Sequence, residues 1–217
     1  MDSESTSVVG KNAGTTPIWL LAIIGLLGGL LLFFLIRFLL TGSLFGTQPF
    51  HGVVLQSPQQ AVNFTLMGPD EQPVSLNDFR GKVVLLYFGY TFCPDACPAT
   101  LSVLKEVRQQ LGRRADDVQV VMITVDPERD TPTRLADYVR SFDPTFVGLS
   151  GTLDQTSAVA TDYGIFFEKQ PGTAATGYLV DHTATVAAID KDGYLRLIFL
   201  FDMSAEEIAA DVRRLLR

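Results

Sequence analysis

Two cysteines four positions apart are the residues of this chain best suited to metal or redox chemistry. Cys93 and Cys97 are its only cysteines, and they lie in the segment YFGYTFCPDACP, residues 87–98. Two cysteines are too few for a disulfide-stapled fold, and a domain of this size builds a core without staples. The pair therefore indicates redox or metal function. A deprotonated cysteine is a soft donor that suits soft cations such as Cu(I).

The spacing of the pair leaves both chemistries open. Thioredoxin-type reductases carry C-x-x-C, whereas this segment is C-x-x-x-C, and the extra residue gives more freedom to span a metal, although it is also compatible with a disulfide. A helix is expected just after the cysteines, and the unpaired N–H groups and dipole at its start favour thiolate. Pro94 and Pro98 stiffen the loop, and Pro98 suits an early helical position, where no N–H is needed.

The elements that must position the pair follow from hydrophobic periodicity and turn signals. A continuous apolar run predicts a strand buried on both faces, and apolar residues three and four apart predict a helix. The expected elements are strands over 83–88 and 118–125, helices over 99–111, 133–142 and 153–163, a hairpin of strands over 185–189 and 194–201, and a last helix opened by a capping box at Ser204 and Glu207. This order predicts an α/β sandwich with a mixed sheet. The cysteine loop follows the first central strand, where sites collect in such sheets.

An apolar stretch before this domain predicts a membrane anchor. Residues 18–36 (IWLLAIIGLLGGLLLFFLI) carry no charge, and at about 1.5 Å per residue they reach roughly 28 Å, enough to cross a hydrocarbon core. A cleaved signal peptide is the alternative, but its apolar stretch is usually shorter and its start basic, whereas this chain starts MDSESTS.

We therefore expect a short tail over 1–16, a single uncleaved transmembrane anchor over 17–40, a linker over 41–58 and one domain over 59–217. Lys11 and Arg37 balance each other, so charge does not orient the anchor. The start also lacks the Arg-rich character of a mitochondrial transit peptide, which favours a bacterial membrane.

The net charge argues against one class of partner. It is −7, so no nucleic-acid partner is indicated. His51, in the expected linker, is interpreted as a solvated surface residue rather than a metal ligand.

Three motifs in order resemble a known family. GKVVLLYFGYTFCPDACP, TVDPERDTP and YLVDHTA are similar to those of the Sco/SenC family of thioredoxin-fold copper proteins, and the resemblance spans about residues 58–217, with the same single anchor in front. The resemblance implies a thioredoxin-like fold. It also implies that Cys93, Cys97 and His182 bind Cu(I), and it leaves Cu(II) binding open. Phe92 stands where other members often have a different residue, and this difference is expected to affect packing or partner contact more than metal ligation.

The resemblance also implies a function. It is that of a membrane-anchored metallochaperone that helps to load the copper-A centre of cytochrome c oxidase subunit II, with another copper-donor protein as a further partner. Copper delivery outside the cytoplasm puts the N-terminus inside and the domain on the periplasmic side. The alternative is a thiol–disulfide reductase, with Cys93 and Cys97 as the redox pair, that keeps the copper-A cysteines reduced. A peroxidase-like activity is a third reading that nothing around the cysteines favours.

His182 lies 85 residues beyond Cys97 (182 minus 97), so only the fold can bring them together. Alone, such a histidine is more often a hydrogen-bonded loop residue than a ligand. In a thioredoxin-like fold, however, its loop faces the cysteine loop. Reducing relatives keep a cis-proline there, and this chain has no proline after Pro171. Zinc also accepts two cysteines and one histidine, but no H-x-E or second C-x-x-C indicates a hydrolytic zinc site.

Several charged residues are candidates for supporting roles. Asp181 is expected either to orient the imidazole of His182 or to be an exposed turn carboxylate. Asp126 ends the second strand and is expected to assist partner docking or brace the loop. Asp95, between the cysteines, is expected to raise their pKa or to meet a partner. Arg129 and Asp130 are interpreted as structural ion partners.

Overall fold

The computed structural model describes residues 17–41, 49–173 and 177–217. The chain divides into two compact units, Met1–Pro49 and Phe50–Arg217. The expected tail over 1–16 lies outside the described residues, as do residues 42–48 of the expected linker. Each unit is described by itself below.

The first unit contains one helix, α1 (Ile18–Thr41). Its segment Ile18–Leu40 is long and apolar enough to cross a membrane, and no residue of its most apolar window is buried within the protein. An exposed apolar surface of this size is unfavourable in water. The helix is therefore consistent with a membrane anchor.

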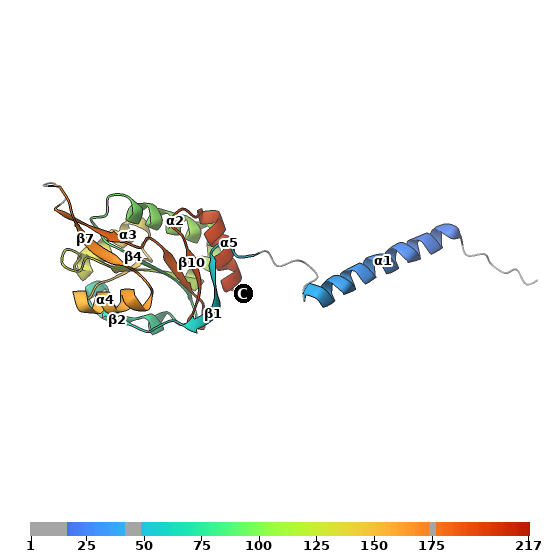
Figure 1. Ribbon diagram of the computed structural model, residues 1–217, viewed down its shortest axis with the longest axis horizontal. Coiled ribbons are helices and arrows are strands. Elements are labelled where there is room, and N and C mark those ends of the chain that lie inside the picture. The colour runs from blue at the N-terminus through green and yellow to red at the C-terminus, as the bar shows by residue number, and fades with distance from the viewer. Residues whose placement is uncertain (1–16, 42–48, 174–176) are drawn as a thin grey trace, which may run out of the picture. The chain divides into compact units, whose positions relative to one another are not determined.

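The second unit is built on a six-stranded mixed sheet (Figure 1). Its order is β1 (Val53–Gln60), β10 (Tyr194–Phe199), β9 (Val186–Ile189), β4 (Val83–Gly89), β5 (Val118–Thr124) and β6 (Val147–Leu149). The last three strands are parallel to one another, whereas the first three join each other and β4 in antiparallel pairs. The predicted mixed sheet is confirmed.

Helices cover both faces of this sheet, which is why every residue of β4 and β5 is buried. They are α2 (Ala96–Leu111), α3 (Pro132–Phe142), α4 (Leu153–Asp162) and α5 (Ala205–Leu215). In Figure 1, α2 and α5 lie side by side on one face and α4 lies on the other. Neighbouring residues of β4 reflect these two faces, because Phe88 packs against Tyr163 at the end of α4, whereas Tyr87 faces Cys97 in α2.

Capping side chains set the starts of two helices. Ser204 and Glu207 form the predicted capping box of α5, and Thr131 caps α3, which begins with Pro132. Helix α2 begins at Ala96, three residues earlier than expected, so Cys97 lies in its first turn.

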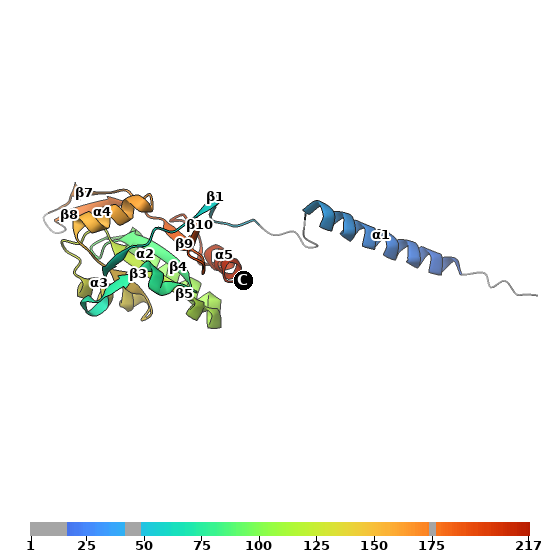
Figure 2. The same ribbon diagram turned by 90° about the horizontal axis from the view of Figure 1, so that it is seen from below.

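The remaining elements are short. They are the hairpin of β2 (Thr65–Met67) and β3 (Pro73–Ser75), the hairpin of β7 (Phe167–Pro171) and β8 (Tyr178–His182), and 3-10 turns over Pro69–Glu71, Leu76–Phe79 and Gly112–Asp117. The β7–β8 hairpin is a separate two-stranded sheet. Figure 2 shows it beside α4, at the end of the domain away from β1 and α5.

Part of the predicted linker is a strand instead. Residues 53–60 form β1, an edge strand that pairs with β10 and has a register shift between Val54 and Gln59. Its side chains are almost all exposed, so backbone hydrogen bonds rather than apolar alternation place it in the sheet. Pro58 lies within the shifted part, where an edge strand tolerates a missing N–H.

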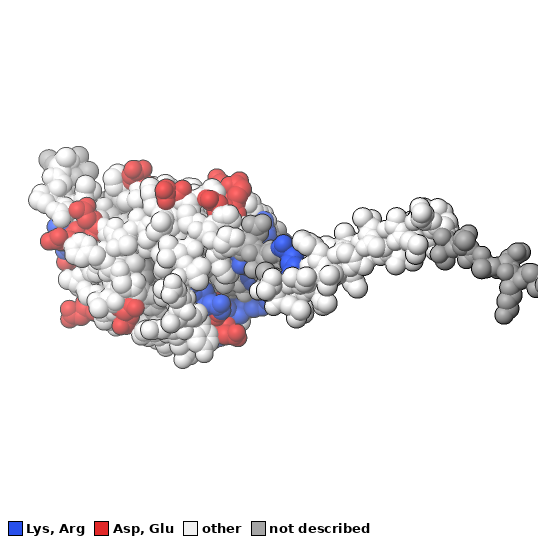
Figure 3. All heavy atoms as spheres, turned by 45° about the vertical axis from the view of Figure 1, so that its right-hand side comes forward, with Lys and Arg blue, Asp and Glu red and all other residues white. Residues whose placement is uncertain are grey.

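Surface charge agrees with the composition. In Figure 3, acidic side chains are scattered over the visible face of the domain, and Lys and Arg gather at one end of it. Both signs are present on this face, although the chain carries a net charge of −7.

Candidate metal centre

The cysteine loop connects β4 to α2. Gly89, the last residue of β4, lies directly behind Cys97: a Cβ at this position would come 2.8 Å from Cys97 Sγ and 2.8 Å from Tyr87 Cε1. Glycine is therefore required where the strand passes the sulfur. Both cysteines are free thiols, Cys97 buried and Cys93 half-buried.

Cys93 acts as the cap of helix α2. The backbone N–H of Cys97 donates to Cys93 Sγ at 3.3 Å, while the side chain of Asp95, at the N-cap position, makes no capping bond. A sulfur thus accepts one of the N–H groups that the first turn of a helix leaves unpaired. This geometry favours negative charge on Cys93.

The two thiols titrate in opposite directions. The Cys97 thiol hydrogen-bonds to Cys93 and lowers the pKa of Cys93 to about 3, helped by His182 and by backbone N–H groups, although burial opposes the shift. The pKa of Cys97 is raised, because its proton is held by Cys93 and because the side chain is buried. At neutral pH the pair is therefore one thiolate and one thiol.

Asp95 does not raise the pKa of Cys93, the first of the two roles expected for it. Its backbone N–H is among the groups that lower the pKa of Cys93, and its side chain is exposed. Of the two cysteines, only Cys97 has a raised pKa, and the causes are its hydrogen bond to Cys93 and its burial rather than Asp95.

His182 reaches the cysteines from the end of β8. Its Nε2 lies 3.5 Å from Cys97 Sγ, and its Nδ1 lies 3.3 Å from the carbonyl oxygen of Thr183. In the tautomer whose Nδ1–H donates to that carbonyl, Nε2 carries the lone pair, which is the form that binds metals. The edges and faces of Tyr87 and Tyr90 surround the ring, at centroid distances of 6.1 and 5.9 Å.

The three ligand atoms of Cys93, Cys97 and His182 all lie within 4.8 Å of one another. Within the described residues this is the one group of three or more His, Cys, Asp or Glu side chains that could hold a metal ion. Three ligands about 2.3 Å from one ion in a trigonal plane lie roughly 4 Å apart, so the cluster fits a single ion with small adjustments. Two sulfurs and an imidazole suit Cu(I) or zinc.

Asp181 does not orient the imidazole. It precedes His182 in β8, and neighbouring residues of a strand point to opposite faces, so its exposed carboxylate is directed away from the ring. The carbonyl of Thr183 takes the orienting role instead. Of the two expected alternatives, the exposed carboxylate is the one observed.

Asp126 braces the loop from a buried position. Its carboxylate is fully buried and accepts hydrogen bonds from Arg129 and, at 2.7 Å, from the hydroxyl of Tyr178. Arg129 is thus the ion partner that the sequence predicted. Asp130 is not one, because its buried carboxylate accepts from Thr91, by N–H at 2.9 Å and hydroxyl at 2.5 Å, and from the Thr124 hydroxyl at 2.7 Å.

Sequence reasoning missed two tyrosines beside the site. Tyr90 accepts the backbone N–H of Val180 at 3.2 Å, and Tyr178 joins β8 to Asp126. Both lie inside the motifs that carry the ligands, which was the available signal. His51, by contrast, is exposed, with Nδ1 3.9 Å from Glu207, as expected of a surface residue.

Comparison with known proteins decides the family. Residues 54–217 match the model of the SCO1/SenC family. The chain belongs to this family.

Curated Sco proteins are similar over the same region. The chain is 38% identical over 154 residues to "Protein SCO2 homolog, mitochondrial" of Mus musculus, which covers 70% of this chain and 60% of that protein. It is 33% identical over 147 residues to the "SCO2-like protein" of Rickettsia felis, covering 67% of this chain and 72% of that protein. The match thus spans less than two thirds of the mouse protein.

Solved Sco structures share the fold. Apo Sco1 of Thermus thermophilus superposes with a TM-score of 0.71 at 40% identity, covering 79% of this chain and 100% of that chain. ScoI of Bradyrhizobium japonicum with copper bound superposes with a TM-score of 0.66 at 39% identity, covering 73% of this chain and 100% of that chain. The predicted thioredoxin-like fold with a mixed central sheet is confirmed.

Proposed function

We propose that this Sco/SenC protein binds Cu(I) through Cys93, Cys97 and His182 and delivers it during the assembly of cytochrome c oxidase. The observation that carries the proposal is the 3.5 Å contact between His182 Nε2 and Cys97 Sγ, two atoms 85 residues apart in sequence. A copper-bound relative at 39% identity supports copper over zinc as the metal.

The chemistry of the donors supports Cu(I). Cys93 is ready to bind as a thiolate at neutral pH, whereas Cys97 must release its proton when the ion enters. Cys97 is buried, while Cys93 and His182 are only half-buried. An incoming ion, or a partner's sulfur that takes the ion away, therefore approaches from the side of Cys93 and His182.

The biological role rests on the family. We propose the copper-A centre of cytochrome c oxidase subunit II as the destination and another copper-donor protein as the source. Helix α1 would hold the chain in a bacterial membrane with the N-terminus cytoplasmic and the copper domain on the periplasmic side. The exposed carboxylates of Asp95 and Asp181 flank the ligands and are candidates for contact with the partner.

Titration of the reduced domain, residues 50–217, with Cu(I) against a chromophoric chelator tests the ligand set. The wild type should bind about one Cu(I) per chain, and Cys93→Ala, Cys97→Ala or His182→Ala should each abolish tight stoichiometric binding. His51→Ala is the matched control, because it removes the other histidine, an exposed one. Wild-type binding by His182→Ala would refute the proposal.

A second function, thiol–disulfide reduction, is favoured by the titration of the pair. The Cys93 thiolate would attack a target disulfide and form a mixed disulfide, and the target's first sulfur would leave as a thiolate. Cys97, after losing its proton, would then attack Cys93 and release the second target sulfur, so that the target is reduced and Cys93–Cys97 oxidised. This reaction does not need His182. Oxidase maturation that survives His182→Ala would favour reduction over delivery.

A further inference from the structure

One cation lies between the two segments that carry the metal ligands. The guanidinium of Arg129 stacks on Tyr178 of β8, 3.7 Å from the ring centroid, and on Phe92 of the cysteine loop, at 4.6 Å. It also donates to the backbone carbonyl of Tyr178 at 3.0 Å. Phe92 is next to Cys93, and Tyr178 is four residues before His182 in the same strand. Arg129 therefore contacts both sides of the metal site.

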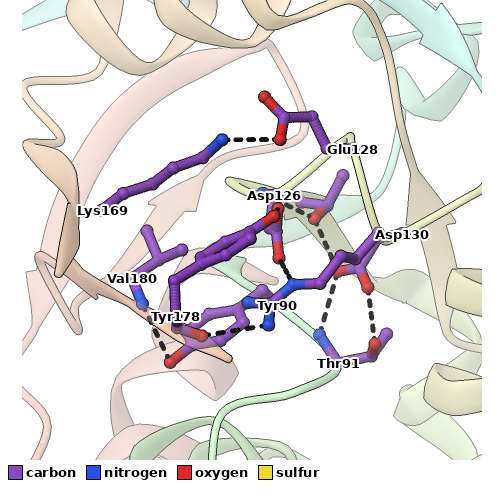
Figure 4. Close-up of polar contacts among 10 residues, drawn as sticks. Tyr90, Thr91, Asp126, Glu128, Asp130, Lys169, Tyr178 and Val180 are labelled. Carbon is purple, nitrogen blue, oxygen red and sulfur yellow. Dashed lines mark hydrogen bonds and ion pairs between the residues drawn. The ribbon is translucent and has the colours of Figure 1, made fainter. Parts of the chain in front are cut away.

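Arg129 is itself held in place by Asp126. The fully buried carboxylate of Asp126 pairs with its Nε, and the other oxygen of that carboxylate accepts from the Tyr178 hydroxyl at 2.7 Å. Figure 4 shows the side chains of Tyr178 and Asp126 next to each other. A buried carboxylate with two donors has one well-defined arrangement, which fixes the direction of the guanidinium.

The strand that carries His182 needs such a support. The β7–β8 hairpin shares no ladder with the main sheet, so its position depends on side-chain contacts. Besides the Tyr178 hydroxyl on Asp126, three of them reach the neighbouring loops: Arg129 to the Tyr178 carbonyl, the Val180 N–H to the Tyr90 hydroxyl at 3.2 Å, and the exposed pair of Lys169 and Glu128 at 2.6 Å. All three lead to the cysteine loop or to residues 126–130 (Figure 4).

Residues 126–130 hold the cysteine loop as well. Asp130 accepts both the N–H and the hydroxyl of Thr91, and Arg129 lies over Phe92. One five-residue segment thus touches the loop that bears the sulfurs and the strand that bears the imidazole. Its side chains are well placed to set the separation between the two.

We propose that Arg129, held by Asp126, is a positioning residue of the metal site, which keeps His182 Nε2 within reach of both sulfurs before the metal arrives. This proposal rests on the proposed function, because one of its tests measures Cu(I) binding. It goes further, because it makes the position of His182, the third ligand, depend on a residue that does not bind the metal. Lysine cannot replace arginine here: an ammonium lacks the planar fork that meets Asp126, the Tyr178 carbonyl and two rings together.

The main test uses Arg129→Gln, Arg129→Lys and Tyr178→Phe in the full chain. Arg134→Gln is the matched control, because Arg134 also lies over Phe92, at 5.3 Å, but is exposed and reaches no residue of β8. The measurements are Cu(I) affinity by chelator competition, X-ray absorption for the copper–imidazole contribution, and amide hydrogen exchange in the metal-free protein.

Arg129→Gln should lower Cu(I) affinity by about 10- to 100-fold, the usual effect of removing a group that orients a ligand. The imidazole contribution should weaken while both sulfurs remain. Exchange of the Val180 amide should accelerate on the order of tenfold, with the amides of β4 and β5 unchanged. Arg129→Lys should rescue little of this, Tyr178→Phe should show a smaller loss, and Arg134→Gln should match the wild type.

Different failures overturn different claims. Wild-type affinity and an intact imidazole contribution in Arg129→Gln would overturn the positioning role. A uniform rise of exchange across β4, β5 and β8 would also overturn it, since Arg129 would then only stabilise the fold. If the wild type bound no Cu(I), the proposed function would fall, while exchange at Val180 would still decide whether Arg129 holds β8.

Discussion

The two sides of the metal site are built by different means. The cysteine side belongs to the main sheet and its helix: β4 is buried along its whole length, Gly89 passes directly behind Cys97, and the first turn of α2 binds Cys93. The histidine side is a two-stranded hairpin outside that sheet, held by single side-chain contacts. The positions of the sulfurs are thus set by dense packing, whereas the position of the imidazole depends on a few single side-chain contacts.

This difference predicts how each side responds to change. Substitutions on the sulfur side should alter both stability and metal binding, because the same packing serves both. Substitutions on the histidine side should alter metal binding and local exchange with little effect on global stability.

The largest expected effect concerns the reactivity of Cys93. With a pKa of about 3, Cys93 should be alkylated at a nearly constant rate from about pH 5 to 8. At about pH 5 its thiolate fraction should be on the order of 1000 times that of an ordinary cysteine. Mass spectrometry after timed alkylation measures this. Cys97→Ala should move the profile toward higher pH, because the Cys97 thiol is the main cause of the low pKa, while Cys97→Ser, which keeps a donor, should move it less. A wild-type midpoint near the usual cysteine value would contradict the proposed hydrogen bond.

The same pair predicts how stability depends on pH. The pKa of Cys93 is lowered and that of Cys97 is raised, so between the folded pKa of Cys93 and the usual cysteine value the unfolded chain binds one more proton than the folded chain. Stability of the metal-free protein should therefore rise with pH in that window. Above it the unfolded chain loses both protons while Cys97 keeps its own in the fold, and stability should fall. Denaturant unfolding of the wild type against Cys93→Ala isolates this contribution, and identical pH profiles would count against it.

Next in size is Gly89→Ala on the sulfur side. The added Cβ would meet Cys97 Sγ and Tyr87 at 2.8 Å, which should cost about 1–3 kcal/mol by overpacking and also weaken Cu(I) binding. Gly148→Ala is the control, because its Cβ would meet Leu135 at 2.7 Å, away from the ligands. Both variants should lose stability in denaturant unfolding, and only Gly89→Ala should lose affinity. Equal affinity in the two would show that the sulfur side is less tightly packed than described.

A smaller effect is expected from Tyr90→Phe on the histidine side. The change removes the hydroxyl that accepts the Val180 N–H and keeps the ring beside His182, so it should cost about 0.5–1.5 kcal/mol locally. Hydrogen exchange should show a faster Val180 amide. Tyr163→Phe is the control, because its hydroxyl donates to the carbonyl of Val62, far along the chain from the ligands. An unchanged Val180 amide would mean that Tyr90 does not hold β8.

The smallest effect is expected for Glu128→Gln. The pair of Glu128 with Lys169 joins the same segments as Arg129, but both side chains are about half exposed, and water and salt screen such pairs. Thermal unfolding and Cu(I) affinity should both match the wild type. A clear loss of affinity would show that the hairpin is held by charge at its surface rather than by Arg129 and the buried carboxylate of Asp126.

The accuracy of the sequence predictions follows the same division. Strands β4 and β5 were predicted within one residue, because strands buried on both faces have continuous apolar runs. Strands β1, β7 and β8 were not predicted, since most of their side chains are exposed or half-buried and their pairing comes from the backbone. Helix α2 was predicted to begin at Ala99, but a cap formed by Cys93 Sγ starts it at Ala96.

The candidate ligands were available from the sequence, whereas their supports were not. Two cysteines four apart, helix capping residues and the family motifs are local patterns, and each reports on neighbours along the chain. The distance from His182 to Cys97, the burial of Asp126 and the position of Arg129 between Phe92 and Tyr178 join segments far apart in sequence. Such contacts depend on how the hairpin packs against the loops, and local sequence patterns do not report on that packing.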